Sequence, residues 1–319
     1  RQLYLIRLGL FEKLGRTSEI EAQLKEMISL FPEDATPTQM LIGMLLSQGR
    51  TDDAEVFLRS LIDPKVDGHE AQMQVVSFIL ARKGPEAAIA ELDELISAGG
   101  SNVPFYRSSR GSLNFDTGKR QEGIAELEEL AKTIEDNEEG RRIKVALARM
   151  YQITGNTDGA KTLVSEVLAS DPSEIEALKI RATWLIGEDN PGDALVDLRS
   201  ALDQSPFDPR IMTLIAEAHD RAGNTELVPD MLSRAVEASR GAPEYALRYA
   251  EYLVGKEQLL PAEDVLKDAL KVDNENIQVL RALGLVYVRL VDRPRLQTIV
   301  STLNRIATES AKSVANDLT

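Results

Sequence analysis

Residues 141–174 read RRIKVALARMYQITGNTDGAKTLVSEVLASDPSE, and this stretch decides the fold. Apolar residues recur every three or four positions on both sides of Gly155, which is the spacing of a helix that buries one face. Glycine accepts the positive φ that a helix C-terminus often requires, and Pro172 cannot continue a helix. The stretch therefore predicts two helices of about 14 residues each, joined by a short turn.

The same layout recurs along the chain with a period close to 34 residues. A Leu or Val marks each repeat, at Leu24, Leu58, Leu92, Leu127, Val164, Leu198, Leu232, Leu266 and Val300. Successive markers are 34, 34, 35, 37, 34, 34, 34 and 34 residues apart. A fixed period of this size indicates an array of helix–turn–helix repeats. With the marker at position 24, the repeats start at Arg1, Ala35, His69, Pro104, Arg141, Ile175, Pro209, Pro243 and Ile277.

Small residues form two further columns in this frame. Position 20 is small at Ala54, Ala88, Gly123, Ala160, Ala194 and Ala262. Position 8 is small at Gly111, Ala148, Ala182, Ala216, Ala250 and Gly284. Small side chains at these positions allow two helices to approach closely, and the Leu or Val at position 24 fills the space beside them. A third column places glycine at the end of the first helix, at Gly15, Gly49, Gly118, Gly155 and Gly223.

These columns resemble the tetratricopeptide repeat family over about 310 residues. Residues 141–174 match the family pattern through Leu147, Ala148, Tyr151, Gly155, Ala160 and Pro172. The resemblance implies an all-α fold, a right-handed α-solenoid or superhelix of nine tandem repeats. We expect a single repeat domain over residues 1–310 and a C-terminal tail over residues 311–319.

Three departures from the pattern predict local irregularity. Arg110 and Asn114 stand where the family places apolar and aromatic residues. The extra residues at 136–138 are expected to lengthen a loop. Pro229 falls inside an expected second helix and predicts that this helix starts late. Because the first helix begins with apolar residues and no cap sequence, we also expect the chain to be a piece of a longer array.

The composition argues against several classes of function. The chain has 319 residues, a net charge of −15 and no cysteine. A net negative charge argues against a nucleic-acid partner, which requires a basic surface. Without cysteine there are no disulfides and no thiolate metal ligands. No apolar run approaches the roughly 18 residues of a membrane-spanning helix. The sequence leaves the compartment open.

Residues that could support catalysis, metal binding or cofactor binding are sparse. His69 and His219 are far apart in sequence, and we expect the first on the surface and the second half-buried. Residues 155–162, GNTDGAKT, resemble a phosphate-binding loop but have the wrong spacing, so an ordinary turn and helix start is expected. Trp184 is expected to be packed. We therefore predict no enzyme activity, no metal and no cofactor.

The family resemblance implies that the first helix of each repeat lines a concave groove, with positions 2, 5, 9, 12 and 13 facing a ligand. The groove candidates on this basis are Phe105, Ser108, Ser112, Phe115, Arg142, Val145, Arg149, Lys179 and Arg210. One interpretation is a basic segment that binds an acidic peptide with an apolar anchor. The alternative is that the arginines pair with neighbouring glutamates. A carboxylate clamp for chaperone C-termini is not expected, because no repeat has Asn at position 9.

The sequence therefore predicts a non-enzymatic scaffold that binds a protein or peptide. Two alternatives stay open. The chain could be an architectural segment of a longer repeat protein in a bacterial envelope or export assembly, where self-association matters. It could also be the substrate-selecting arm of an enzyme whose catalytic domain lies elsewhere.

Overall fold

The structure is a computed structural model that describes residues 2–62, 68–306 and 308–318. Over these ranges it has 19 helices and no strand. The chain divides into two compact units, Arg1–Ala146 (unit 1) and Leu147–Thr319 (unit 2), whereas the sequence suggested one domain. None of the described helices is both long and apolar enough to span a membrane.

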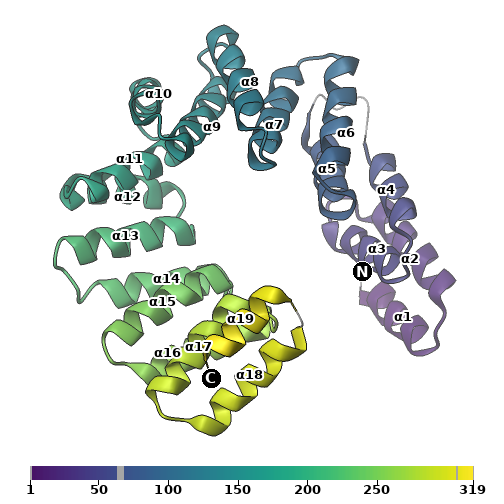
Figure 1. Ribbon diagram of the computed structural model, residues 1–319. Coiled ribbons are helices and arrows are strands. Elements are labelled where there is room, and N and C mark those ends of the chain that lie inside the picture. The colour runs from purple at the N-terminus through teal and green to yellow at the C-terminus, as the bar shows by residue number, and fades with distance from the viewer. Residues whose placement is uncertain (1, 63–67, 307, 319) are drawn as a thin grey trace. The chain divides into compact units, whose positions relative to one another are not determined.

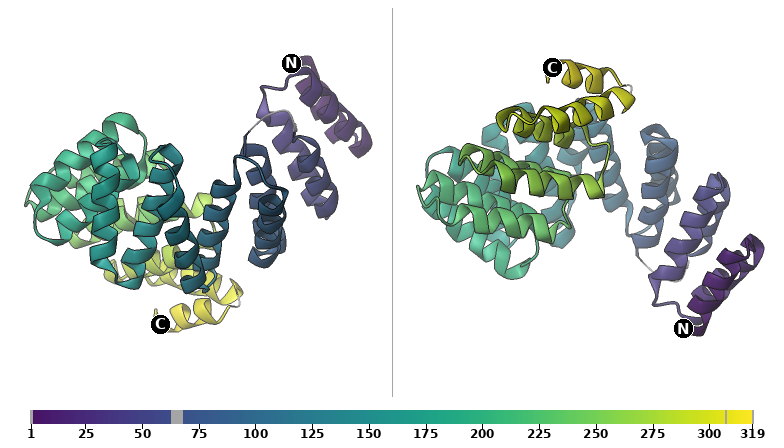
Figure 2. Two further views of the ribbon diagram at one scale, coloured as in Figure 1. Left: turned by 90° about the horizontal axis from the view of Figure 1, so that it is seen from above. Right: turned by 90° about the horizontal axis from the view of Figure 1, so that it is seen from below.

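Within each unit, consecutive helices pack side by side (Figures 1 and 2). Unit 1 contains α1 (Gln2–Lys13), α2 (Thr17–Leu30), α3 (Ala35–Ser47), α4 (Thr51–Ser60), α5 (Glu70–Lys83), α6 (Pro85–Ala98), α7 (Val103–Asp116) and α8 (Arg120–Thr133). The helix α9 (Glu138–Thr154) begins in unit 1 and ends in unit 2. Unit 2 continues with α10 (Thr157–Ser170), α11 (Ile175–Gly187), α12 (Pro191–Gln204), α13 (Pro209–Arg221), α14 (Val228–Ala238), α15 (Pro243–Gly255), α16 (Leu259–Val272), α17 (Ile277–Arg289), α18 (Arg293–Ile306) and α19 (Glu309–Asp317).

The helices from α1 to α18 alternate as the sequence predicted. We call the odd-numbered members A helices and the even-numbered members B helices. Every Leu or Val marker lies on a B helix and is buried, with exposures between 0 and 7%. The residues of the two small columns are buried as well. An all-α solenoid of helix pairs is therefore confirmed, and the core consists of the interfaces between successive helices.

The interface between α7 and α8 leaves no room for a Cβ atom at two of its glycines. A Cβ atom added at Gly123 would lie 2.9 Å from the Cβ of Phe115 and would also clash with the carbonyl oxygen of Gly111. A Cβ added at Gly111 would overlap the side chain of Leu127, which is fully buried. Both glycines are needed because the two backbones come so close.

The extra residues of the fourth repeat lengthen the helix α9, so the prediction that they lengthen a loop is wrong. The connection between α8 and α9 spans only residues 134–137, and α9 has 17 residues. The side chain of Asn137 accepts a hydrogen bond from the backbone N–H of Gly140 at 3.0 Å. Glu138 and Glu139 then fall in the first turn, where the helix dipole favours acids. This cap starts the helix ahead of the repeat frame.

Two further segments show how local signals set helix bounds. The expectation for Pro229 is confirmed, since α14 begins only at Val228 and the proline occupies its first turn. Most of the expected C-terminal tail instead belongs to α19, in which Ala311 and Ala315 are buried, and Leu318 directly after the helix is buried as well. The side chain of Thr308 caps α19 by accepting a hydrogen bond from the N–H of Ala311 at 3.1 Å.

The turn after each A helix requires a positive φ, and not every repeat supplies glycine there. Gly155 and Gly223 have φ values of 85° and 78°. The equivalent residues Asp189, Glu257 and Val291 have φ values of 61°, 60° and 56°. A β-branched residue is the least suited to this conformation. Val291 is 78% exposed, so packing does not compensate for its strained backbone.

We expect Val291→Gly to stabilise unit 2 by roughly 1 kcal/mol. The left-handed conformation costs an L-residue about 1–2 kcal/mol, and the greater entropy of glycine in the unfolded chain offsets only part of the strain that the substitution relieves. Guanidinium denaturation followed by circular dichroism measures the change. Val272→Gly is the matched control, since Val272 is also exposed but lies in helical backbone at the end of α16. The control should lose stability. A loss of stability in both variants would contradict the account of the turn.

Candidate partner-binding surface

The A helices of unit 2 present a surface on which apolar and charged side chains lie together. Because all A helices pack on their B helices through the same positions, they also turn equivalent positions outward. This surface includes a basic cluster on α9, α11 and α13, and an apolar groove between α15 and α17.

The groove between α15 and α17 has a volume of about 440 Å³. Its apolar lining consists of Leu247, Ala250, Val254, Leu266, Ala282, Leu285 and Val286. Leu285 is 49% exposed, so a large aliphatic surface is open to a ligand. The polar side chains of the groove are Glu251, Gln278, Arg281 and Arg289. An apolar site with a few charged groups is the usual form of a peptide-binding groove.

The two arginines of the groove differ in their contacts. Arg289 donates hydrogen bonds to the backbone oxygen of Val254 at 3.1 Å and to Glu257 at 2.7 Å, which fixes its guanidinium beside the groove. Arg281 is exposed and makes no ion pair with any described residue. A guanidinium beside an apolar surface binds carboxylates through paired N–H donors. The groove therefore offers an anchor for an apolar side chain and a contact for an acid.

The basic cluster is built around two acids that cross-link three successive A helices. Lys179 is 7% exposed and pairs with Glu176 at 2.5 Å and with Asp208 at 2.9 Å. Arg149 pairs with the second oxygen of Glu176. Arg210, at the start of α13, is exposed and forms no ion pair within the described part of the chain.

Asp208 caps α13 while it holds Lys179. Its carboxylate accepts hydrogen bonds from the backbone N–H groups of Arg210 at 2.8 Å and Ile211 at 3.3 Å. Burial alone would raise the pKa of Asp208, but the hydrogen bond from Lys179 and these backbone N–H groups outweigh it and hold the pKa below its ordinary value. Burial, together with the nearby charge of Arg210, lowers the pKa of Arg149. The ion pairs therefore fix Arg149 and Lys179 in place, whereas Arg210 pairs with no acid in the described ranges.

The structure places the other groove candidates in unit 1. Phe105 is half-buried and stacks on His69, with ring centroids 3.6 Å apart. Ser108 and Ser112 are also half-buried. Phe115 and Val145 are each 5% exposed and offer little surface to a ligand.

Arg142 is exposed and pairs with Glu138 on the same helix at 2.6 Å. Arg142 and Arg149 both have glutamate partners, which agrees with the alternative interpretation of the basic segment. Within unit 2, the structure brings together Arg149, Lys179 and Arg210.

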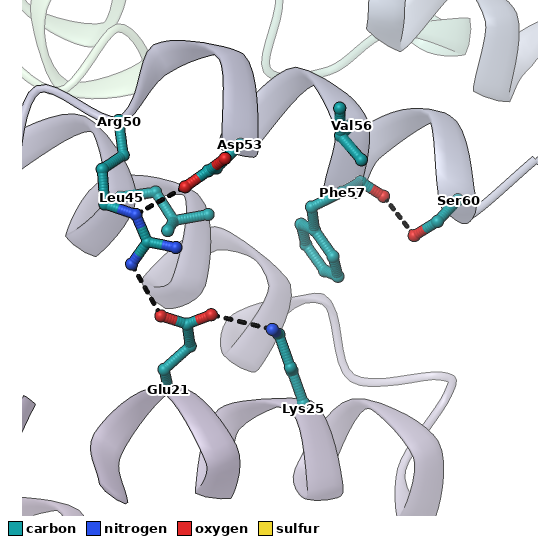
Figure 3. Close-up of a pocket in the computed structure, with 8 residues that line it drawn as sticks. All are labelled: Glu21, Lys25, Leu45, Arg50, Asp53, Val56, Phe57 and Ser60. Atoms are coloured by element: carbon teal, nitrogen blue, oxygen red, sulfur yellow. Dashed lines mark hydrogen bonds and ion pairs between the residues drawn. The ribbon is translucent and has the colours of Figure 1, made fainter. Parts of the chain in front are cut away.

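A second pocket, of about 480 Å³, lies between the B helices α2 and α4 (Figure 3). Its charged side chains bind one another. Glu21 accepts hydrogen bonds from Lys25 and Arg50, both at 2.7 Å, and Arg50 also donates to Asp53 at 2.6 Å. These bonds lower the pKa of Glu21. The charges connect two neighbouring helix pairs, so we interpret this pocket as a joint between repeats.

The structure assigns ordinary roles to the other residues that the sequence singled out. Residues 155–162 form a turn and the start of α10, where Asn156 accepts a hydrogen bond from the N–H of Gly159 at 3.1 Å. Trp184 is partly buried, with the Lys161 ammonium 6.0 Å from its ring. Among the described residues, no group of three or more His, Asp and Glu side chains is arranged to hold a metal ion.

The groove between α15 and α17 was not predicted from the sequence, although its residues occupy the positions that face a ligand in the family. In the repeat frame, Leu247, Glu251 and Val254 occupy positions 5, 9 and 12 of the eighth repeat. Arg281 and Leu285 occupy positions 5 and 9 of the ninth. The same positions that selected candidates in earlier repeats would have selected these. The predicted candidates centred on a segment rich in basic residues, whereas the lining of this groove is mainly apolar.

Comparison with known proteins identifies the fold. No protein-family model matches the chain, and no curated protein matches its sequence. A solved tetratricopeptide repeat protein from Parabacteroides merdae is similar, with a TM-score of 0.53 and 15% identity over 78% of this chain and 96% of that one. The type IV pilus biogenesis factor PilW gives 0.56 and 17% identity over 67% and 99% of the two chains. Cut9 in its complex with Hcn1 gives 0.55 and 12% identity over 89% and 55%. The tetratricopeptide-repeat prediction is thus confirmed at the level of the fold.

His219 generates a prediction about pH. It lies on α13, is 9% exposed, and its Nδ1 atom has no hydrogen-bond partner among the described residues. Burial, and then the charge of Arg199, lower its pKa, while Glu226 acts in the opposite direction. The folded state therefore prefers neutral His219. Its contribution to stability is complete above the ordinary histidine pKa of about 6.5 and is lost as the pH falls below that value.

When the pH is lowered from about 7.5 to about 5.5, we expect the melting temperature of unit 2 to decrease. The decrease should be smaller in His219→Gln, because glutamine does not titrate. Fluorescence of Trp184, the only tryptophan in the sequence, reports on unit 2. His69→Gln in unit 1 serves as the control and should keep the full pH dependence. An identical pH dependence in His219→Gln and the wild type would contradict the assignment.

Proposed function

We propose that this chain, which has the tetratricopeptide-repeat fold, is a non-enzymatic scaffold that binds a protein partner on the A-helix face of unit 2. The observation that carries the proposal is the groove between α15 and α17. It combines an open aliphatic surface at Leu285 with the guanidinium of Arg281, which makes no ion pair with any described residue. The solved structures of similar fold support a scaffold in general, and the groove supports this particular surface.

The chemistry of the groove specifies the kind of peptide. An aliphatic or aromatic side chain of the partner would sit against Leu247, Val254 and Leu285, where burial of apolar surface contributes about 25 cal/mol per Å². A carboxylate of the partner would pair with Arg281. Glu251 lies in the same groove and repels an acid close to it. The acid of the peptide should therefore lie near Arg281 and away from Glu251, which fixes the orientation of the peptide in the groove.

The basic cluster supports the same choice of partner. Lys179 and Arg149 form ion pairs with Glu176 and Asp208, so they shape the surface but their charges are largely neutralised. Arg210 remains available beside them. A partner that extends along the A helices from the groove would meet this second cation, and two such contacts favour an acidic, extended segment over a neutral one.

The interaction can be tested with a peptide selected from a random library against the intact protein. We expect selected peptides to combine an apolar residue with an acid. Leu285→Glu should weaken their binding at least about tenfold, because it places a carboxylate in the apolar surface and opposes the acid of the peptide. Fluorescence anisotropy measures the affinity.

Val196→Glu is the matched control for this experiment, since Val196 is 63% exposed on the B helix α12 of the same unit. It should bind the peptide like the wild type. Peptides that bind Leu285→Glu as tightly as the wild type would contradict the assignment of the groove.

An architectural role is the second candidate function, and the outer face of α1 favours it. This face exposes Leu3, Ile6 and Leu10, an apolar surface of the kind that successive repeats of an array bury between them. PilW, one of the structures similar in fold, is described as a type IV pilus biogenesis factor. The two candidate functions use different units, so one chain can combine them.

A further inference from the structure

A polar hollow in unit 1 is separate from the surface proposed to bind a peptide. It has a volume of about 540 Å³ and is lined by residues of α6, α7, α8 and the turn before α8. Asn114 is the buried side chain among them, with 9% exposure. Its Oδ1 atom has no hydrogen-bond partner among the described residues. A buried amide without a partner destabilises a fold, so we expect Asn114 to have a role beyond packing.

Asn114 occupies position 11 of its repeat, where every other repeat places an aliphatic or ring-bearing side chain. These residues are Phe11, Leu45, Ile79, Tyr151, Leu185, His219, Leu253 and Tyr287. Leu45, Ile79, Leu253 and Tyr287 are between 2 and 5% exposed, so position 11 lies on the packed side of its A helix. In the fourth repeat this side carries an amide instead.

The ninth repeat shows how an aromatic ring fills the same place. The hydroxyl of Tyr287, on α17, donates a hydrogen bond to Glu263 on the preceding B helix at 3.3 Å. The guanidinium of Arg295, on the following B helix, lies 5.0 Å from the centroid of the ring. Tyr287 is 5% exposed, so the ring is enclosed.

In the second and ninth repeats, charged residues join successive repeats beside position 11. They occupy positions 16 and 19 of the repeat and position 21 of the repeat before it. The three residues are Arg50, Asp53 and Glu21 in the second repeat, and Asp292, Arg295 and Glu263 in the ninth. The arginine of each set bonds both acids, at 2.5–2.7 Å. These charges are therefore used within the chain.

The fourth repeat lacks this set of ion pairs. The same three positions hold Lys119, Glu122 and Ile89. Lys119 and Glu122 are exposed and make no ion pair with any described residue, and an aliphatic side chain replaces the acid of position 21. The polar groups around Asn114 are therefore open to a ligand.

The lining of the hollow favours a neutral ring over an ion. It carries three cations and four acids, so its net charge is small. Arg110 forms ion pairs with acids of both flanking helices, which fix its guanidinium. Guanidinium groups bind the faces of aromatic rings, as Arg295 does in the ninth repeat. Ile89 and Ala125 add aliphatic surface.

We propose that this hollow binds a tyrosine side chain of another protein. The ring would lie against Ile89 and Ala125, in the place that Tyr287 fills in the ninth repeat. Its hydroxyl would form a hydrogen bond with the amide of Asn114, whose last side-chain bond can turn either the oxygen or the NH2 group toward the ligand. Tyrosine combines an apolar body with a polar tip and so matches both parts of the hollow.

A second copy of the chain is not the source of this ring. None of the seven tyrosines, all of which lie in the described ranges, is exposed. The partner is therefore a different protein. The hollow lies in unit 1 and the groove between α15 and α17 lies in unit 2, so the failure of one assignment leaves the other unaffected.

Two small probes test the proposal on the full chain. They are N-acetyl-tyrosine amide and N-acetyl-phenylalanine amide, which lacks the hydroxyl. NMR follows their binding through the methyl resonances of Ile89 and Ala125, which line the hollow. We expect the tyrosine probe to shift both resonances to saturation. It should bind at least about fivefold more tightly than the phenylalanine probe, which is the scale of one neutral hydrogen bond.

Two substitutions at Asn114 separate the role of the amide from that of the hollow. Asn114→Leu introduces the residue type of Leu45 and Leu253 and removes the amide, so the two probes should bind it equally. Asn114→Tyr fills the hollow from within and should abolish the binding of both. Asp116→Tyr is the matched control, because Asp116 is exposed on the same helix, and it should bind like the wild type. Circular dichroism checks that each variant keeps its helix content.

The proposal is overturned if neither probe binds the wild type, or if both bind it equally. It is overturned as well if Asn114→Leu keeps the preference for tyrosine, or if Asn114→Tyr binds the probes as the wild type does. A dimer that sedimentation detects in the wild type and not in Asn114→Tyr would also overturn it, since a second copy of the chain would then occupy the hollow.

Discussion

The whole structure depends on the insertion of one branched aliphatic side chain of each B helix beside small residues of the same helix and of the preceding A helix. In the fourth repeat the side chain of Leu127 lies directly against Gly111, and in the sixth repeat Leu198, Ala182 and Ala194 all have 0% exposure. Fully burying a leucine stabilises a fold by about 1.5–3 kcal/mol, and this chain repeats the arrangement along its length. A repeat array gains stability mainly from such contacts with its neighbours. Because the joint is the same each time, the outward-facing positions of the A helices are the same too.

This dependence explains which features could be predicted from the sequence. The markers, the small columns and the late start of α14 at Val228 follow from residues close together in the chain, and the structure confirms them. The longer α9 was not predicted because the cap at Asn137 competes with the repeat frame. The helix α19 was not predicted because Thr308, Ala311, Ala315 and Leu318 signal it only when read together as a cap and an apolar face.

The candidate site was harder to predict, because its charges belong to different repeats. Lys179 pairs with Asp208, which lies 29 residues further along the chain. A sequence shows that both charges exist but does not show that their side chains meet. Phe115 and Val145 were predicted to face a ligand but are buried, because the helices packed against a residue determine how much of its side chain is exposed.

Ion pairs such as Arg50 with Glu21 and Arg289 with Glu257 join neighbouring repeats. Each exposed pair of this kind contributes about 0–1 kcal/mol. The cations Arg210 and Arg281 make no ion pair with any described residue, and they lie on the A-helix surface of unit 2 that we propose binds a partner.

The most direct test of the account compares two truncations on α12. Leu198 has 0% exposure and Val196 is 63% exposed, and Trp184 on the adjacent helix α11 reports the unfolding of the surrounding repeats. The free energy of unfolding should fall by about 2–5 kcal/mol in Leu198→Ala, because truncation leaves a cavity in the joint. It should change by no more than about 0.5 kcal/mol in Val196→Ala. If Leu198→Ala were no more destabilising than Val196→Ala, the marker residues would not hold the fold together, and the account would be wrong.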